Sequence, residues 1–322
     1  MPNDQRNLPR LVADIGGTNA RFATFFDNAA TLSNECSMSC DRYAGPVETI
    51  EAYLTETNAP RPREIVMAVA TPVTGDRIKL TNNHWDFSIE ATRQGLRVDR
   101  LLLLNDFTAL ALSLPHLTSA QQRQVGSGQA VSKAAIALIG AGTGLGVSGL
   151  LPTKDGYVPI EGEGGHVGFS PANPRETEIL RIVWREFSHV SAERLISGIG
   201  LDPLYRAIAE LEGVSGPAPT PALITERALR DNDPLCCDVM NTFCALLGTA
   251  AANLAITLGA RGGVYIGGGI VPHLGEFFDR SPFRERFETK GRFSDYLKAI
   301  PTKVILAEYP ALTGAAYALL RD

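Results

Sequence analysis

Two glycine-rich segments of this chain contain the residue types that bind phosphate groups. The first is Asp14-Ile-Gly-Gly-Thr-Asn-Ala-Arg21, and the second is Gly140-Ala-Gly-Thr-Gly-Leu-Gly146. Glycine allows a backbone to turn tightly and to approach a ligand closely. Backbone N–H groups, a hydroxyl and a guanidinium donate hydrogen bonds to phosphate oxygens, and Asp14 suits the metal ion that accompanies a polyphosphate. The candidate phosphate-binding residues are Asp14, Gly16, Gly17, Thr18, Asn19, Arg21, Gly142, Thr143 and Gly144.

Each glycine-rich segment, taken alone, is also explained by a tight turn without a ligand. The second segment is followed by another apolar strand, whereas the dinucleotide fingerprint is followed by a helix, and it lacks the Gly-Lys-Ser/Thr of a P-loop. A third run, Gly267-Gly-Gly269, also follows an apolar strand. The three runs together favour a nucleotide held between two related halves of the chain.

A polar pair, Asn105-Asp106, follows the apolar segment Arg100–Leu104. In open α/β sheets ligands gather at the carboxyl ends of strands, so this pair is a candidate binding or catalytic site. Asn and Asp are also favoured residues at the start of a helix. Because one residue is enough to cap a helix, the pair still supplies a second polar group at that edge.

An acidic segment, Glu161-Gly-Glu-Gly-Gly-His166, combines three ionisable side chains with closely spaced glycines. A metal site, a purely structural loop and a polyol site are all compatible with it. The glycines disfavour the helix that a Glu-x-x-His metal site needs. Carboxylates accept hydrogen bonds from hydroxyl groups and His can donate or accept, so a polyol fits Glu163 and His166 best. Glu193 is a weaker candidate, because Ser191-x-Glu193 also resembles a helix start.

The composition is that of a globular protein with a substantial core. The chain has 322 residues, 44% hydrophobic and 20% charged, which favours about two domains. The net charge is −5 and no block of Lys or Arg occurs, so we expect no nucleic-acid partner. No apolar run approaches the ~20 residues of a membrane span, and the N-terminus has no signal region, so we expect no membrane partner.

Cysteine usage indicates a reducing compartment. The five cysteines are odd in number and include no Cys-x-x-Cys pair, so we expect free thiols and a cytoplasmic protein. Cys36 and Cys40 are spaced so that they could share a metal ion. Two incidental thiols near a turn are the stronger interpretation, because no second ligand pair lies nearby.

Hydrophobic periodicity predicts an α/β protein whose elements deliver these candidate residues. Apolar or alternating segments predict strands at 11–15, 20–26, 64–70, 77–81, 100–104, 263–266 and 303–306, and a glycine-rich hairpin over 136–150. Helical spacing predicts helices at 43–58, 107–114, 176–187, 202–212, 222–229, 235–258, 311–320 and over most of 272–292. A polar connection at 118–129 is the predicted domain boundary.

Six motifs in order resemble the bacterial ATP-dependent glucokinases of the proteobacterial type, within the superfamily of sugar kinases, actin and heat-shock ATPases. The resemblance covers essentially the full length, and its motifs are Asp14–Ala23, Leu104-Asn-Asp-Phe107, Gly140–Gly146, Glu161–His166, Ser191-Ala-Glu-Arg194 and Ile266-Gly-Gly-Gly-Ile270. The cysteine-rich zinc motif of another group of bacterial glucokinases is missing. One departure is Ser197-Gly-Ile-Gly200, where the family pattern leads us to expect Ser-Gly-Pro-Gly.

The resemblance implies a fold and residue roles. It implies two actin-like ATPase domains around a central cleft, each a mixed sheet with flanking helices: residues 1–115 with 306–322, and residues 116–305. Asp106 would be the catalytic base that faces the sugar 6-hydroxyl, and Asn105 would bind neighbouring hydroxyls. The 1-, 2- and 3-hydroxyl side would be held by Glu163, His166 and Glu193. Gly267 and Gly268 would lie by the adenosine, and Asp14 would hold Mg²⁺ with water between them.

The function implied is a glucokinase, an ATP-dependent hexose 6-phosphotransferase that makes glucose 6-phosphate from glucose and ATP. Its cofactors are ATP and Mg²⁺, and a homodimer is the family expectation. A kinase for another hexose or an amino sugar is the alternative within enzymes. A non-catalytic sugar-sensing regulator is another, but only ten residues precede the first predicted strand, which leaves no room for a helix-turn-helix. An actin-like filament protein would leave the segment Glu163–His166 unexplained.

Overall fold

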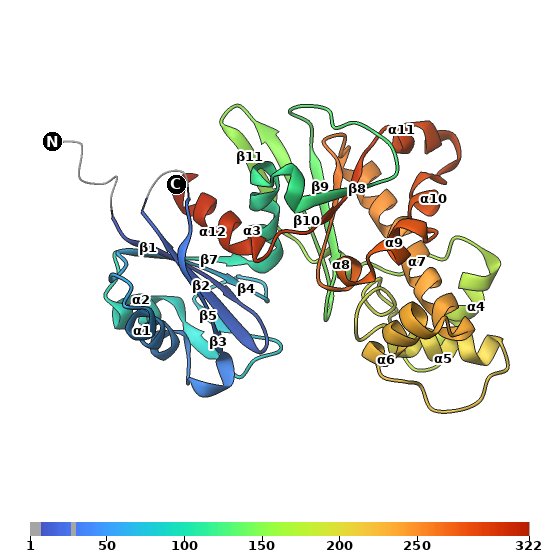
Figure 1. Ribbon diagram of the computed structural model, residues 1–322, viewed down its shortest axis with the longest axis horizontal. Coiled ribbons are helices and arrows are strands. Elements are labelled where there is room, and N and C mark those ends of the chain that lie inside the picture. The colour runs from blue at the N-terminus through green and yellow to red at the C-terminus, as the bar shows by residue number, and fades with distance from the viewer. Residues whose placement is uncertain (1–7, 27–29, 322) are drawn as a thin grey trace. The chain divides into compact units, whose positions relative to one another are not determined.

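The computed structural model describes residues 8–26 and 30–321, and the chain forms two compact units. The first unit consists of Met1–Leu117, Tyr157–Glu161 and Ala307–Asp322, and the second of Thr118–Gly156 and Gly162–Leu306. Figure 1 shows the strands and helices of each unit. Most residues before the first strand, on which the expectation of no helix-turn-helix rests, lie outside the described residues.

The first unit is built on a mixed five-stranded sheet in the order β3-β2-β1-β4-β7. Strands β1, β4 and β7 are parallel, and β2 and β3 extend the sheet as antiparallel strands. A two-stranded ribbon, β5-β6, is separate from this sheet. The elements are β1 (Arg10–Ile15), β2 (Asn19–Phe25), β3 (Ser33–Ser39), α1 (Pro46–Thr57), β4 (Glu64–Val69), β5 (Arg77–Lys79), β6 (Asp86–Ser88), α2 (Ile89–Leu96), β7 (Arg100–Asn105), α3 (Asp106–Ser113) and α12 (Pro310–Arg321).

The alternation of side chains along β1 gives this sheet two buried faces. Leu11, Ala13 and Ile15 pack into one apolar cluster with residues of α1 and α2, whereas Val12 packs into the other with residues of α3 and α12. Figure 1 shows α1 and α2 on one side of the sheet and α12 beside α3. The sheet therefore holds its strand ends rigidly between two helical layers.

The second unit is built on a mixed six-stranded sheet in the order β11-β10-β9-β12-β13-β8, although all of β11 except Gly156 is grouped with the first unit. Strand β12 is parallel to β9 and β13, while β9 pairs antiparallel with β10 and β13 with β8. The strands are β8 (Gln122–Val125), β9 (Ile136–Ala141), β10 (Leu145–Thr153), β11 (Gly156–Ile160), β12 (Val264–Gly267) and β13 (Thr302–Ile305). The helices are α4 (Pro174–Val183), α5 (Leu201–Leu211), α6 (Pro221–Glu226), α7 (Pro234–Leu258), α8 (Ile270–Leu274), α9 (Glu276–Arg280), α10 (Phe283–Glu288) and α11 (Ser294–Lys298).

The predicted mixed sheets with flanking helices are confirmed, and the differences concern polar or irregular segments. Residues 118–129 were expected to be a connection only, and that expectation is wrong, because β8 lies within them at the sheet edge. Its sequence Gln-Arg-Gln-Val has one buried residue, Val125. It therefore lacks the alternation of apolar and polar residues that would predict a strand. The helical stretch 272–292 is divided into short helices, since Gly275 has a left-handed φ of 53°.

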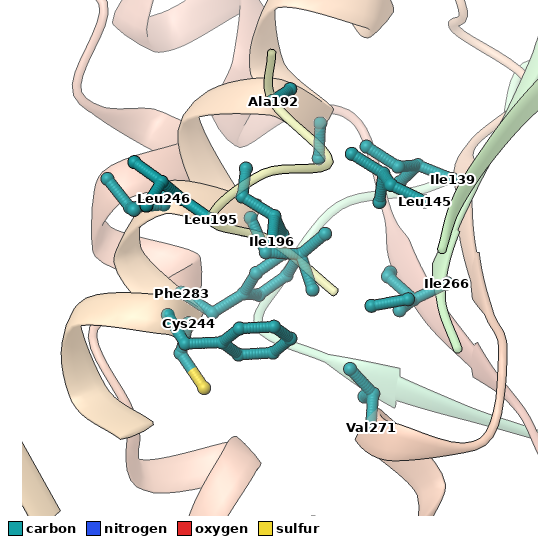
Figure 2. Close-up of a cluster of buried hydrophobic side chains, with 14 of the residues drawn as sticks. Ile139, Leu145, Ala192, Leu195, Ile196, Cys244, Leu246, Ile266, Val271 and Phe283 are labelled. Carbon is teal, nitrogen blue, oxygen red and sulfur yellow. The ribbon is translucent and has the colours of Figure 1, made fainter. Parts of the chain in front are cut away.

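Helix α7 differs from the expectation that no segment is apolar enough to cross a membrane. The helix has 25 residues, and an 18-residue window of it has a mean hydropathy of 1.5, so by length and composition alone it could cross a membrane. In the structure 67% of the apolar window is buried, and Val239, Phe243 and Leu247 lie in the core of the second unit. Figure 2 shows that core with Cys244 and Leu246 of α7 beside Phe283. Helix α7 is therefore packed as a core helix.

Helix α12 packs closely on α3 at Gly314. A Cβ placed on Gly314 would overlap the carbonyl oxygen of Ala109. The expected result of Gly314→Ala is a loss of about 1 kcal/mol or more in the free energy of unfolding, because backbone must move to admit the methyl group. Urea unfolding measures it.

Gly95→Ala is the matched control, since Gly95 lies inside α2 and a Cβ there makes only ordinary contacts with Val47. It should be neutral or stabilise by up to about 1 kcal/mol through helix propensity. Equal effects of the two substitutions would contradict close packing at Gly314.

Candidate functional site

The first glycine-rich turn joins β1 to β2 at the carboxyl end of β1. The N–H of Gly16 donates to the carbonyl of Asn19 at 2.9 Å, which closes the turn, and Thr18 at its tip is exposed. Asp14 lies opposite Arg21 in the antiparallel pair, and Arg21 Nη1 donates to Asp14 Oδ2 at 3.4 Å. The turn therefore presents backbone, a hydroxyl, a carboxylate and a guanidinium together.

Asp14 is the carboxylate that fits a magnesium ion. Burial raises the pKa of the Asp14 carboxyl above its usual range, and the charge of the neighbouring Arg21 opposes that rise. The Arg21 guanidinium also lies over the ring of Tyr309, 4.8 Å from its centroid. Mg²⁺ is usually bound by one or two carboxylates together with substrate phosphates and water. One poorly solvated carboxylate at the turn fits this ligand set.

Residues that the sequence did not single out hold this turn in place. Asn83 Nδ2 donates to the carbonyl of Gly16 at 3.2 Å, and the N–H of Cys40 donates to the carbonyl of Thr18 at 2.8 Å. A Cβ on Gly17 would lie 2.8 Å from the carbonyl oxygen of Asn82. Asn82 and Asn83 were recognisable only as a polar loop, because their role depends on contact with a distant turn.

The pair Asn105-Asp106 lies where β7 ends and α3 begins. Asn105 is paired with Val69 across the parallel strands β4 and β7, at the same sheet edge as Ile15. Its Oδ1 accepts from the N–H groups of Phe107 at 2.9 Å and Thr108 at 3.2 Å, so Asn105 is the helix N-cap. Asp106 is half-buried in the first helical turn, and its Oδ1 also accepts from Phe107 N–H at 2.9 Å.

The second glycine-rich turn joins β9 to β10 and is tied to the segment 197–200. Gly142 N–H donates to the carbonyl of Gly144 at 2.9 Å. The Gly142 carbonyl accepts from Gly198 N–H at 2.8 Å, and the Thr143 carbonyl accepts from Ile199 N–H at 3.4 Å. Proline, the residue expected at position 199, has no N–H and could not make the second bond. The departure from the family pattern therefore adds a bond to this turn.

The third glycine run packs directly beside the second turn. A Cβ on Gly140 would lie 2.5 Å from the carbonyl carbon of Gly267, and one on Gly268 would overlap the backbone of Ala141. Gly268 also has a left-handed φ of 77°. The absence of side chains thus lets β12 and β9 end side by side, which brings Gly267 and Gly268 next to the second turn.

The acidic segment forms a compact turn that pairs with residues 191–193. Residues Gly164–His166 form one 3-10 turn, closed by His166 N–H donating to the Glu163 carbonyl at 3.0 Å. The Gly165 carbonyl accepts from Glu193 N–H at 2.9 Å. Glu193 Oε1 lies 3.8 Å from His166 Nδ1. Glu163 and His166 are exposed, so they are available to a ligand.

The structure thus gathers the predicted residues into two sets, one in each unit. In the first unit the turn Gly16–Thr18 and the pair Asn105-Asp106 follow parallel strands of one sheet. In the second unit Glu193 lies beside the Gly142–Gly144 turn, and His166 lies beside Glu193. Glu161 is grouped with the first unit, apart from Glu163 and His166. Within residues 8–26 and 30–321, no group of three His, Cys, Asp or Glu side chains is arranged to hold a metal ion.

Comparisons with known proteins agree in one family. A family model described as Glucokinase matches residues 11–322. A glucokinase of Aromatoleum aromaticum is 52% identical over 312 residues, which are 97% of this chain and 94% of that protein. A glucokinase of Neisseria meningitidis is 49% identical over 319 residues, 99% of this chain and 97% of that protein. The crystal structure of a glucokinase from an Antarctic psychrotroph has a TM-score of 0.89 and 34% identity, covering 98% of this chain and 99% of that one.

The raised pKa of Asp14 predicts how Asp14→Asn changes the pH dependence of stability. The native protein keeps the Asp14 proton to a higher pH than the unfolded chain does. Wild type therefore loses stability as the pH rises from the unfolded pKa of about 3.9 through the raised folded value. Asn is neutral throughout. The variant should gain free energy of unfolding relative to wild type as the pH rises above about 4, the ordinary pKa of an Asp carboxyl.

Urea unfolding at several pH values, without nucleotide or metal, measures this difference. A difference between the two proteins that stays constant over that range, or that moves in the opposite direction, would contradict the burial of the Asp14 carboxylate.

Proposed function

This chain belongs to the glucokinase family, and on that premise we propose that it transfers the γ-phosphate of ATP to the 6-hydroxyl of glucose. The products are glucose 6-phosphate, which enters glycolysis, and ADP. In enzyme terms it is an ATP-dependent hexose 6-phosphotransferase, EC 2.7.1.2. One observation carries this proposal. Within one unit, Glu193 is hydrogen-bonded both to the Glu163–His166 turn and to Leu145, the residue that follows the Gly142–Gly144 turn.

The second unit would supply sugar recognition and part of the nucleotide site. Glu163, His166 and Glu193 would hold the 1-, 2- and 3-hydroxyl side of glucose, since carboxylates accept hydrogen bonds from hydroxyl groups and His can do either. Gly142, Thr143 and Gly144 would lie along the ATP phosphates, and the neighbouring Gly267 and Gly268 by the adenosine. A bound sugar would cover these side chains, so a sugar that lacks a recognised hydroxyl would leave one of them without a partner and would be rejected.

The first unit would supply the catalytic carboxylate and the other phosphate turn. Asp106 would orient the 6-hydroxyl and accept its proton as the new bond forms, because a carboxylate is in general a poor base for an alcohol at the start of the reaction. Asn105, held as the cap of α3, would bind a neighbouring hydroxyl. In phosphoryl transfer positioning and electrostatics supply most of the catalysis.

Mg²⁺, when bound with ATP, would neutralise charge on the phosphate oxygens. Asp14 would hold the ion through water, and Gly16, Gly17, Thr18, Asn19 and Arg21 would line the same phosphate-binding turn. We propose that the two compact units correspond to the predicted domains and that sugar binding closes them. Closure would exclude water from the reacting phosphate and so suppress idle hydrolysis of ATP.

The free state of all five cysteines supports a reducing, cytoplasmic location. The homodimer expected from the family stays a prediction, which the mass of the protein in solution would test. A sugar kinase of another specificity is the remaining alternative. Kinetics with glucose, mannose, fructose and N-acetylglucosamine decide between them, and a clear preference for a sugar other than glucose would refute the proposal.

Asp106→Asn should lower kcat for glucose-dependent ADP release by about 10² or more, because an amide cannot accept the hydroxyl proton. The KM values for glucose and ATP should change much less. Asp155→Asn, in the exposed turn after β10, is the matched control and should keep wild-type activity. Activity of Asp106→Asn within about tenfold of wild type would exclude Asp106 as the base.

A further inference from the structure

The two carboxylate oxygens of Glu193 face two different partners. Oε2 accepts from the backbone N–H of Leu145 at 2.8 Å. Leu145 is the residue directly after Gly144 and begins β10, so this bond fixes one end of the second glycine-rich turn. Oε1 lies 3.8 Å from Nδ1 of His166, on the side of the predicted sugar ligands. One side chain thus contacts both the phosphate turn and the sugar-binding segment.

The Glu193 carboxylate lies in the space that a side chain at Gly144 would occupy. A Cβ on Gly144 would overlap Glu193 Oε2, whereas a Cβ on Gly142 would meet no atom within 4 Å. Gly144 is also absent from the glycines with a left-handed φ. A methyl group at position 144 would therefore have to displace the Glu193 carboxylate, while the backbone conformation does not by itself require glycine there.

The segments that carry Leu145 and Glu193 both pack into the core of the second unit. Figure 2 shows Leu145 and Ile139 near Ala192 and Ile196, which flank Glu193 in the chain. The carbonyl of Glu193 accepts from Ser197 Oγ at 2.7 Å, and its N–H donates to the Gly165 carbonyl. Because hydrogen bonds hold the backbone of Glu193 on both sides, backbone movement cannot compensate for a rotation of its carboxylate. Such a rotation therefore acts directly on the bond to Leu145 N–H.

We propose that Glu193 is a positioning residue for the phosphate turn as well as a sugar ligand, and that it couples the binding of glucose to the binding of ATP. The proposal rests on the proposed function and extends it. A sugar hydroxyl that donates to Oε1 orients the carboxylate, keeps Oε2 on Leu145 N–H and so holds the Gly142–Gly144 turn ready for phosphate. By thermodynamic linkage, ATP then strengthens glucose binding by the same factor.

Titration calorimetry tests this coupling without turnover, using glucose and a non-hydrolysable ATP analogue, each alone and in the presence of the other. In wild type, each ligand should tighten the other by about fivefold or more. Gly144→Ala displaces the carboxylate, so glucose affinity should fall by about tenfold or more and the coupling factor should approach one. Gly142→Ala adds the same methyl group in open space and should keep the wild-type coupling factor, whatever its effect on the analogue alone.

Substitution of Glu193 itself separates the two roles. Glu193→Ala should weaken the analogue in the absence of sugar by about fivefold or more, since the Leu145 N–H loses its acceptor. Glu193→Gln keeps an acceptor oxygen and should retain analogue affinity within about threefold while it weakens glucose. An unchanged analogue affinity in Glu193→Ala, or equal coupling in Gly144→Ala and Gly142→Ala, would overturn the proposal.

These outcomes are distinguishable from failure of the proposed function. Wild type that binds glucose and the analogue with coupling, yet releases no ADP with glucose, would refute the kinase function and leave the coupling role of Glu193 intact. Wild type that phosphorylates glucose but binds the two ligands independently would support the kinase function and refute the coupling role of Glu193.

Discussion

The short segment from Ser191 to Gly200 is the constraint on which the second unit's site depends. Its backbone pairs with the turn Glu163–His166, the proposed sugar ligands, through Glu193, and with the glycine-rich turn Gly142–Gly144 through Gly198. Ser197 is fully buried, and its hydroxyl donates to the Glu193 carbonyl and accepts from Gly200 N–H at 3.0 Å. The segment thus adds hydrogen bonds to both turns, and loops alone rarely hold side chains with the precision that chemistry requires.

The two glycine-rich turns resemble each other in sequence, but they are supported in different ways. The first is held by an amide side chain, Asn83, and by the backbone of Cys40. The second is held by a carboxylate, Glu193, and by the backbone of residues 198 and 199. The internal similarity therefore covers the glycine-rich turns and their flanking strands but not the residues that support the turns. This difference agrees with the proposed roles, in which the first turn binds phosphate and metal and the second lies beside the sugar.

The sequence predicted the parts of this molecule whose signals are local. Apolar runs such as Glu64–Val69 identified the buried strands, and glycine runs identified the turns, because burial and backbone geometry each leave a residue pattern. The edge strand Gln122–Val125 was missed, since one buried side chain gives no periodicity. The bond from Leu145 N–H to Glu193 joins residues that are 48 positions apart. Contacts of that kind follow from the assembled sheet and cannot be deduced from spacing. The roles of residues came from family resemblance, which local patterns did not supply.

The placement of α12 has a consequence for how the protein is made. This helix covers one face of the first sheet, where Leu312 and Ala315 share a cluster with Val12 and Val66, yet it follows the entire second unit in the chain. During translation, the strands of the first unit emerge with one apolar face covered by α3 alone. They stay so for on the order of ten seconds or more while the second unit is synthesised. The second unit can complete its own core first, whereas the first unit must wait for α12. The order of assembly on the ribosome is therefore expected to run opposite to the order of the two sheets in the sequence.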